Sequence, residues 1–502
     1  MKANKLLLAL PLSLCLIGCG KVTKPTTKSN TSGNTTAAPT TTAAPTTTAA
    51  PTTTAKPHTS SVINFYGYNT EFKYLLEKYY GEVATTTAHT TTLKNGDVIN
   101  WVELPNVIEQ YISGLDEGLA TNSVDMFLLE NGYSYKYLNS NYIATLDDTK
   151  INFDNEFEYT KNLAKNESGK ICAVNYTANQ GTLLYNQNVA KEVWGNDITH
   201  EQIKEKLSTK GNFVSAAVDV SKVPGKYMIT GYDELKLLYD ANISSPVFDG
   251  QNYTIDKEFF RWAKDTRDYN QAGFIMNIGD EYNIWGEEWG KEIGRDNVLI
   301  HRTAPWFTIY CVTGNRHKDG EADKPISELT DCKLKMVESY NPFFWNSMMI
   351  GVTKTAKEND SKMDTITDIF NAVVGNKDTA IRITKEENHG YLINNVAAME
   401  ELANDDFGKL AYFGGQNIYE CYLNAGKACN AKYCNTDTMK DNYSVSEKFQ
   451  LYFASFYIRE MKTASEAWKN LVDELNNFYG IEKDNIKLDP DVTIIGDMII
   501  IS

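Results

Sequence analysis

The chain has 502 residues, of which 42% are hydrophobic, and a formal net charge of −16. This length and composition predict a globular body of one oversized domain or two to three ordinary ones. Residues 1–18 contain two lysines and no acid, so removing them changes the charge from −16 to −18. Such an acidic body repels phosphate backbones and anionic lipids, which argues against nucleic acid and membrane surfaces as partners of the folded part.

The N-terminus has the pattern of an exported protein. Lys2 and Lys5 precede an apolar run at 6–17, which is too short for a bilayer core of about 30 Å and therefore predicts a signal peptide. The run ends in Leu-Ile-Gly before Cys19, which resembles the lipobox of bacterial lipoproteins. We therefore expect residues 1–18 to be removed and Cys19 to be lipidated, anchoring the protein on the outer face of a bacterial cell membrane.

A linker rich in threonine, proline and alanine follows, and with Cys19 it covers residues 19–61. It contains three copies of AAPTTT, at 37–42, 43–48 and 49–54. Because it has almost no large apolar side chains to bury, we expect it to be disordered. At roughly 3 Å per residue it could hold the body up to about 100 Å from its anchor.

The folded body begins near Val62 and alternates strand-like and helical patterns. Strands are predicted at 62–68, 124–129, 171–174, 183–185, 298–300 and 348–352, with a strand-like tail at 492–502. Helices are predicted at 70–80 with Thr70 as N-cap, and at 106–119, 133–138, 233–239, 257–269, 362–374, 391–402, 447–461 and 464–478. This alternation indicates an α/β architecture with ligand groups at the carboxyl ends of the strands.

The segment 169–195 contains two short apolar runs separated by a polar bend. Asn179 and Gln180 lie in this bend. In a chain of this length, such a bend is a candidate crossover between two lobes, and a cleft between lobes is the usual place for a small polar ligand.

Six segments in this order resemble the bacterial extracellular solute-binding proteins of the sugar-binding type, the family 1 or maltose-binding-protein-like proteins. They are VINFYGYNTEFKYLLEKYY, SVDMFLLENGYSYKYLNSNYIATLDD, GKICAVNYTANQGTLLYNQNVAKEVWG, VLIHRTAPWF, FFWNSMMIGVTKTAKENDSKMDTITDIF and TASEAWKNLVDEL. The resemblance covers 62–478. Two departures are a tail of about twenty residues after Gly480 and an enlarged region between Gly195 and Pro305.

The resemblance implies a two-lobed periplasmic-binding-protein-like fold, with several crossovers and a ligand cleft between the lobes. The expected N-terminal lobe comprises 62–178 and 350–405, and the C-terminal lobe 179–349 and 406–502. The resemblance also implies a monomer, not an enzyme, that captures a carbohydrate, expected to be an oligosaccharide, and delivers it to the membrane permease of an ABC importer. The sequence contains no GxxxxGK[ST] motif, so the ATPase of such an importer is a separate chain.

Sugar binding requires flat aromatic faces for the C–H-rich side of a pyranose, and acids or amides for its hydroxyls. Trp306, on the matching Pro-Trp motif, is the expected stacking residue. Glu130 follows a buried strand and could bind the ligand or cap the next helix. The expected ligand-binding residues are Tyr68, Asn69, Glu71, Glu130, Asn179, Gln180, Trp285, Trp306, Trp345 and Gln416. Asn179 and Gln180 could equally serve a structural hinge, and Trp262, in the middle of a helix, is predicted to be core.

Two other functions remain open at this stage. A tethered glycoside hydrolase needs only two carboxylates about 5–10 Å apart, and a glycan-capture adhesin needs no permease. Metal chemistry is not predicted, because the six histidines show no HxxxH or HExxH spacing, and no cofactor is expected. The sequence does not determine whether the six cysteines at 172, 311, 332, 421, 429 and 434 form disulfides or are free thiols.

Overall fold

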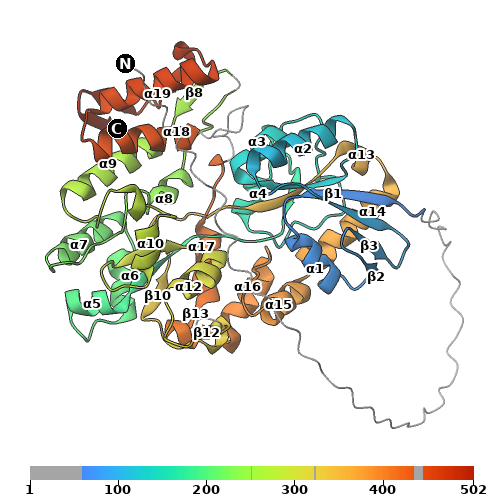
Figure 1. Cartoon of the computed structure of the whole chain (residues 1–502), viewed down its shortest axis with the longest axis horizontal. Helices are drawn as coiled ribbons and strands as arrows, with labels where there is room; N and C mark the ends of the chain where they lie inside the picture. The colour runs from blue at the N-terminus through green and yellow to red at the C-terminus, as the bar shows by residue number, and fades with distance from the viewer. Residues whose placement is uncertain (1–58, 250, 322–323, 435–444) are drawn as a thin grey trace, which may run out of the picture.

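The computed structural model describes residues 59–249, 251–321, 324–434 and 445–502. The predicted signal peptide, Cys19 and the linker up to residue 58 lie outside these ranges. Within them, no helix combines the length and the apolar character needed to cross a bilayer. Two groups of elements, one around each of two sheets, make up the body (Figure 1).

The first lobe is built on a seven-stranded mixed sheet with the strand order β2-β3-β4-β1-β5-β11-β6. The strands are β1 Val62–Gly67, β2 Val83–Thr86, β3 Thr90–Leu93, β4 Val98–Glu103, β5 Met126–Glu130, β6 Ala173–Asn175 and β11 Met348–Val352. β1 runs parallel to β4 and β5, whereas β11 is antiparallel to both β5 and β6. The central strand β5 is buried up to Leu129, and only its last residue, Glu130, emerges from the core.

The helices of this part are α1 Glu71–Tyr79, α2 Ile108–Ala120, α3 Asn131–Leu138, α4 Glu158–Leu163, α13 Lys354–Lys357, α14 Asp360–Phe370, α15 Lys377–Glu386 and α16 Val396–Ala403. In Figure 1, α2 and α3 lie above the sheet and α1 lies below it. Thr70 occupies the N-cap position of α1, but its side chain makes no capping bond. The Oδ1 atom of Asn69 accepts the Glu71 N–H instead, at 3.1 Å.

The second lobe contains a three-stranded antiparallel sheet with the order β10-β7-β9. Its strands are β7 Thr182–Asn186, β9 Ile300–Thr303 and β10 Leu334–Val337, and its helices are α5 Gln187–Trp194, α6 His200–Leu207, α7 Lys210–Ser221, α10 Glu287–Ile293, α11 Pro305–Phe307, α12 Thr313–Asn315 and α17 Ile418–Ala428. A two-stranded ribbon joins β12 Lys409–Leu410 to β13 Gln416–Asn417. β7 is fully buried along its length, so its near-continuous apolar sequence reflects a central strand covered on both faces.

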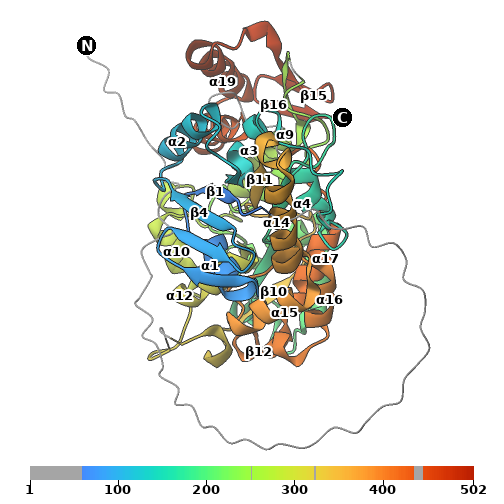
Figure 2. The ribbon, with the colours of Figure 1, turned by 90° about the vertical axis from the view of Figure 1, so that its right-hand side faces the viewer.

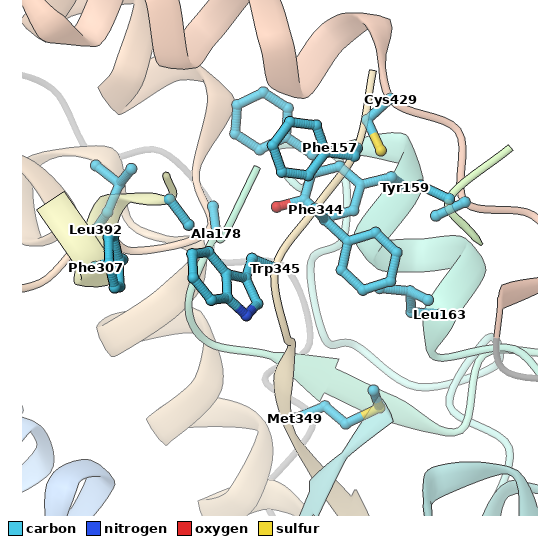
Figure 3. Packing of buried hydrophobic residues seen from close by; sticks show 14 of the residues in the cluster. Phe157, Tyr159, Leu163, Ala178, Phe307, Phe344, Trp345, Met349, Leu392 and Cys429 are labelled. Carbon is cyan, nitrogen blue, oxygen red and sulfur yellow. The ribbon is translucent and has the colours of Figure 1, made fainter. Parts of the chain in front are cut away.

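Three crossover segments run side by side where the chain passes between the two sheets. The central segment, 176–181, is bonded on one side to 392–394, where the Ala178 N–H donates to the Leu392 carbonyl at 3.0 Å. On its other side, the Gly181 N–H donates to the Phe343 carbonyl at 2.7 Å. Figure 3 shows Ala178, Trp345 and Leu392 in this packed region. A Cβ on Gly181 would lie 2.1 Å from the Phe343 ring, so only glycine allows the segments to approach this closely.

These crossovers place the expected lobe boundaries on the chain. β6 belongs to the first sheet and β7 to the second, and the expected boundary at 178/179 lies between them. The expected return boundary at 349/350 lies inside β11, because Met348 and Met349 already pair with β5 in the first sheet. The passage back to the first sheet therefore precedes Met348.

The enlarged middle region packs against the C-terminal part of the chain, which comprises α18 Val445–Tyr452, α19 Ala464–Tyr479 and the tail after Gly480. The other elements are α8 Lys236–Asp240, β8 Tyr253–Ile255, α9 Lys257–Gln271, β14 Ile486–Leu488, β15 Val492–Ile495 and β16 Met498–Ile501. β14 pairs in parallel with β8, and β15 and β16 form a terminal hairpin (Figure 2). Trp262 of α9 is fully buried, which confirms its prediction as a core residue.

Three predicted helices have a different winding or a later start. The predicted helix at 362–374 is α14 followed by a π-helical turn, Asn371–Gly375, and that at 447–461 is α18 followed by a π-helix, Phe453–Arg459. The predicted helix at 391–402 begins only at Val396 in α16, because residues 392–394 are held extended against the central crossover. The apolar spacing indicates a helix but does not register such tertiary constraints.

Candidate functional site

Four aromatic side chains gather around a fifth, Trp345, in the second crossover, the segment 343–347 that precedes β11. Trp345 contacts Phe307 at a ring-centroid distance of 4.7 Å, Trp306 at 5.1 Å and Trp285 at 5.7 Å. Trp289 extends the cluster through Trp285, at 5.6 Å. Trp306 and Trp285 stack at 6.0 Å with an interplanar angle of 20°. The three tryptophans predicted for the site therefore form one aromatic cluster, in which Trp345 is buried.

Trp306 is positioned by a strand that turns directly into a helix. β9 ends at Thr303, and Pro305 begins the short helix α11 as its first residue, a position that suits proline because its missing N–H is not needed there. The indole Nε1–H of Trp306 donates to the backbone carbonyl of Trp345 at 3.1 Å. This bond holds the half-buried ring against the crossover and leaves part of it accessible.

Trp285 lies at a backbone position that normally requires glycine. The Gly286 N–H donates to the Asn283 carbonyl at 2.7 Å and closes a tight turn, and Trp285 adopts a φ of 74° in it. Positive φ at this turn position is strained for any residue with a Cβ. The indole is nevertheless 48% exposed. A strained backbone that presents a large exposed ring beside a cleft is typical of a functional position.

Glu130 lies where β5 ends and faces the second crossover. It occupies the N-cap position of α3 but makes no side-chain capping bond; its Oε2 atom instead accepts a hydrogen bond from the Asn346 amide at 2.9 Å. Burial raises the pKa of Glu130 above its usual value, and the Asn346 bond opposes that shift. Asn346, with a φ of 64°, directly follows Trp345, so this carboxyl group and the aromatic cluster are joined through adjacent residues.

A second buried carboxyl group, that of Glu71, lies at the start of α1. Its Oε2 atom accepts a hydrogen bond from the Tyr176 hydroxyl at 2.6 Å. Burial raises the pKa of Glu71, and the Tyr176 bond opposes this. The same hydroxyl contacts the Met348 sulfur at 3.6 Å, and Met348 pairs with Glu130 across the sheet. Glu71, Tyr176 and Glu130 therefore occupy one neighbourhood.

The remaining predicted residues differ in what they offer a ligand. Tyr68 is half-buried and packs edge-on against Tyr111 at 5.1 Å, while Asn69 caps α1 through its Oδ1 atom. The backbone carbonyl of Asn179 accepts the Trp345 N–H at 2.9 Å, and the backbone N–H of Asn179 donates to the Tyr159 hydroxyl oxygen at 2.8 Å. Asn179 thus belongs structurally to the crossover.

Gln180 and Gln416 are held inside the protein framework. Gln180 is fully buried, and its Oε1 atom accepts the Tyr159 hydroxyl at 3.2 Å. The Gln416 amide bonds both to the N–H of Met336, at 2.9 Å, and to its carbonyl, at 2.6 Å. These bonds clamp the β12–β13 ribbon to β10. The side chain of Gln416 is therefore engaged in structure rather than presented to a cleft.

Residues that the sequence reasoning missed complete the site. Arg302 of β9 is 6% exposed, and its guanidinium lies 4.3 Å from the centre of the Trp345 ring. The Glu234 carboxyl group accepts the backbone N–H of Arg302 at 2.7 Å and the indole N–H of Trp289 at 2.8 Å. Burial raises the pKa of Glu234 to about 7. Arg302 could have been noticed from its place in the apolar strand, four residues before Trp306, where a charge is unexpected.

A cavity of 240 Å³ adjoins this cluster. Residues from both lobes and from the second crossover line it, including Asn131, Gly132, Asp233, Lys236, Asp240, Arg302, Phe344, Asn346, Ser446 and Gln450. Charged groups on a small cavity wall can bind polar ligands but offer little apolar area. The aromatic surface and the cavity meet at Arg302 and Trp345.

Within the described ranges, no group of three or more His, Cys, Asp or Glu side chains is placed to hold a metal ion. Cys172, Cys332, Cys421 and Cys429 are buried free thiols, and burial raises the pKa of Cys332 and Cys429 to about 12. Such thiols are poor nucleophiles, because the reactive form is the thiolate.

Comparison with known proteins identifies the fold. No family model matches the chain, and no curated protein is significantly similar to it in sequence. A solved structure described as an extracellular solute-binding protein of family 1 has a TM-score of 0.61 at 14% identity, covering 83% of this chain and 98% of that one.

Two further solved structures support the same conclusion. The sugar-binding protein MalE from Xanthomonas citri has a TM-score of 0.54 at 11% identity, covering 82% of this chain and 95% of its own. An ABC transporter-associated binding protein from B. animalis subsp. lactis, solved in complex with β-1,6-galactobiose, has a TM-score of 0.52 at 15% identity, covering 86% of this chain and 100% of that one. The chain therefore has the two-lobed α/β fold of the family 1, MalE-like extracellular solute-binding proteins.

Proposed function

We propose that this chain is the solute-binding component of an ABC importer and that it captures a carbohydrate in the cleft between its lobes. The observation that carries this proposal is the cluster of Trp285, Trp306 and Trp345 next to the half-buried residues Glu71 and Glu130. The solved structures with the same fold are sugar-binding transport proteins, which supports a binding rather than an enzymatic role.

The chemistry of the site suits a sugar. Indole faces stack against the C–H-rich side of a pyranose ring, and carboxylates accept hydrogen bonds from its hydroxyls. The exposed Trp285 and the half-buried Trp306 offer two adjoining indoles, which is more stacking surface than a single ring needs and favours an oligosaccharide. We assign ligand contact to Glu71, Glu130, Trp285, Trp306 and Trp345, with Tyr68 at the margin.

Four of the predicted ligand residues receive other roles in this proposal. Asn69 positions Glu71 by capping α1, and Asn179 and Gln180 form the hinge crossover. Gln416 fastens the β12–β13 ribbon. The Asn69 Oδ1 atom and the Gln416 amide are already bonded to the protein, so a ligand would have to break existing bonds to reach them.

The proposal includes the anchoring and the division into lobes. The sequence pattern at 16–19 supports lipidation of Cys19 on the extracytoplasmic side, and the linker after it supports a tethered monomer that delivers its ligand to a membrane permease. We assign 62–178 and the segment from Met348 to 405 to the first lobe, and 179–347 with 406–502 to the second.

The test is ligand-induced thermal stabilisation. Full-length protein is screened with neutral mono- and oligosaccharides, and a true ligand raises the melting temperature by mass action. We expect Trp306→Ala to weaken binding of that ligand about tenfold or more through loss of a stacking face. The matched control is Trp468→Ala, which removes a half-buried tryptophan of α19 that packs on Phe260, at 6.0 Å.

The same samples test the alternative functions. Release of shorter sugars from an oligosaccharide during incubation would replace the binding role with glycoside hydrolysis. Affinity confined to insoluble glycans would favour an adhesin. If Trp306→Ala and Trp468→Ala bind the ligand equally well, Trp306 does not belong to the site.

A further inference from the structure

Part of the lining of the cavity beside the aromatic cluster comes from the enlarged middle region and from the C-terminal part of the chain. Lys236 and Asp240 come from α8 in the enlarged middle region, and Ser446 comes from α18 in the C-terminal part. Asn131 and Asn346, which also line the cavity, belong to the first lobe and the second crossover. The enlarged middle region and α18 thus meet at a cavity that adjoins the proposed site.

Arg302 contributes a cation to this cavity with few bonds to the protein. The guanidinium is stacked on Trp345 rather than paired with a carboxylate, and its Nη1 atom makes only a long bond of 3.4 Å to the Asp233 carbonyl. Its Nε–H has no acceptor among the described residues. A guanidinium has five N–H donors, and leaving such donors unsatisfied in a buried place is unfavourable. The side chain is therefore short of acceptors among the described residues.

An acceptor in the same cavity is short of donors. Lys236 is 5% exposed and donates to both Asp240 Oδ2 and the Ser446 hydroxyl. The other oxygen of Asp240, Oδ1, is buried and has no donor among the described residues. One wall thus contains an unsatisfied donor on Arg302 and an unsatisfied acceptor on Asp240. A group that both accepts and donates hydrogen bonds, as a hydroxyl does, satisfies both.

The charges on the wall favour a neutral occupant. Asp233 and Asp240 balance Lys236 and Arg302, and the exposed Glu447 adds a further acid at the rim. A ligand carboxylate would meet Arg302 favourably but would also lie near two carboxylates in a poorly solvated place, where like charges repel strongly. The volume of 240 Å³ is below the range of about 300–1,000 Å³ for complete small-molecule sites, so the cavity accommodates part of a ligand.

We propose that this cavity is a subsite for one neutral, hydroxyl-rich unit of the ligand, with Arg302 as donor and Asp240 as acceptor. The proposal rests on the proposed function, because the aromatic surface next to it would hold the adjoining sugar units. Lys236 and Ser446 are positioning residues, which fix the Asp240 carboxylate. The enlarged middle region and the C-terminal part would then set which terminal unit is accepted.

The experiment measures ligand binding by calorimetry on the full chain and on two variants, Arg302→Gln and Asp240→Asn. The probes are maltotriose, cellotriose, xylotriose, mannotriose and β-1,6-galactotriose, followed by the uronic-acid-terminated analogue of the tightest binder. We expect each variant to weaken the tightest trisaccharide about tenfold or more, as for lost hydrogen bonds to charged groups. We also expect the uronate analogue to bind wild type more weakly than its neutral parent, and Asp240→Asn to reduce that difference.

Controls separate a binding role from a structural one. Unfolding of each ligand-free variant is measured in parallel, and Arg302→Lys, which retains the charge with fewer donors, should recover part of the affinity. A change in preference between the neutral and the uronate probe is not produced by a merely structural defect. If both variants bind the trisaccharide within twofold of wild type while Trp306→Ala is weakened, the subsite is wrong and the proposed function stands. If wild type binds none of the neutral sugars in the wider screen, the proposed function itself fails and the subsite with it.

Discussion

Replacing Trp285 by glycine and by alanine separates the cost of its backbone from the use of its ring. Trp285 has a φ of 74° in the turn closed by Asn283 and Gly286. Glycine adopts this conformation without strain, whereas alanine retains most of the strain and loses the ring. The two variants remove the same indole, so the difference between them reports on the backbone alone.

The expected magnitudes follow from the geometry. A left-handed conformation costs a residue with a Cβ about 1–2 kcal/mol relative to glycine, and the greater freedom of glycine in the unfolded chain offsets about 0.4–1 kcal/mol of this. Trp285→Gly should therefore be about 0.5–1 kcal/mol more stable than Trp285→Ala. Relative to wild type, the glycine variant loses stacking on Trp306, worth about 0.5–1.5 kcal/mol, but also loses the strain, so its stability should stay within about 1 kcal/mol.

The assay combines urea unfolding of the ligand-free protein with calorimetric titration of the sugar found by screening. Both variants should bind that sugar about tenfold more weakly, since a tenfold change corresponds to about 1.4 kcal/mol and one stacking face contributes a similar amount. If Trp285→Ala is as stable as Trp285→Gly, the turn is not strained. If both variants keep wild-type affinity, the exposed ring does not contact the ligand.

Two further predictions concern the crossovers and the buried acid below the cluster. Gly181→Ala should lower the free energy of unfolding by about 1–3 kcal/mol, because its Cβ would lie 2.1 Å from the Phe343 ring. The control is Gly81→Ala, which has no atom within 4 Å of the added Cβ. Equal urea midpoints for the two variants would contradict the close packing at Gly181. Burial raises the folded-state pKa of Glu234 from 4.5 to about 7. Because the unfolded chain therefore loses this proton at a lower pH than the folded protein, the stability of the fold is highest below pH 4.5 and falls as the pH rises to 7. The fall is at most about 1.4 kcal/mol per pH unit. Glu234→Gln should flatten this fall in a series of unfolding curves between pH 4.5 and 7.5, and an unchanged slope would show that another group causes it.

The sequence predicted the general architecture of this protein well, because the order of its strand-like and helical segments along the chain indicates the fold class. The alternation of apolar strands and amphipathic helices indicated an α/β body, and the polar bend at 176–181 indicated a passage between sheets. Local features that depend on residues far away in the chain could not be predicted as well from the sequence. The start of α16 at Val396, for example, is fixed by hydrogen bonds between residues 392–394 and the central crossover.

For the same reason, only part of the candidate site could be predicted from the sequence. The Pro-Trp motif indicated Trp306, and the structure brings Trp285 and Trp345 against it. Arg302 is marked in the sequence only as a charge in an apolar strand, and nothing in the sequence marks Glu234, because its significance depends on burial beneath that cluster. Gln416 was a reasonable amide candidate, yet its bonds to Met336 depend on a pairing between segments 80 residues apart.

The parallel pairing of β8 with β14 affects the order in which parts of the chain can fold. Residues 253–255 find their partner strand at 486–488, more than two hundred residues later, and contacts of such large sequence separation form slowly. A chain emerging from synthesis or secretion therefore lacks the strand that completes this part of the second lobe until its last residues are available. The same late segment includes α18, which supplies Ser446 to the cavity wall, so a molecule truncated before residue 445 could complete the first lobe's sheet while leaving that wall unfinished.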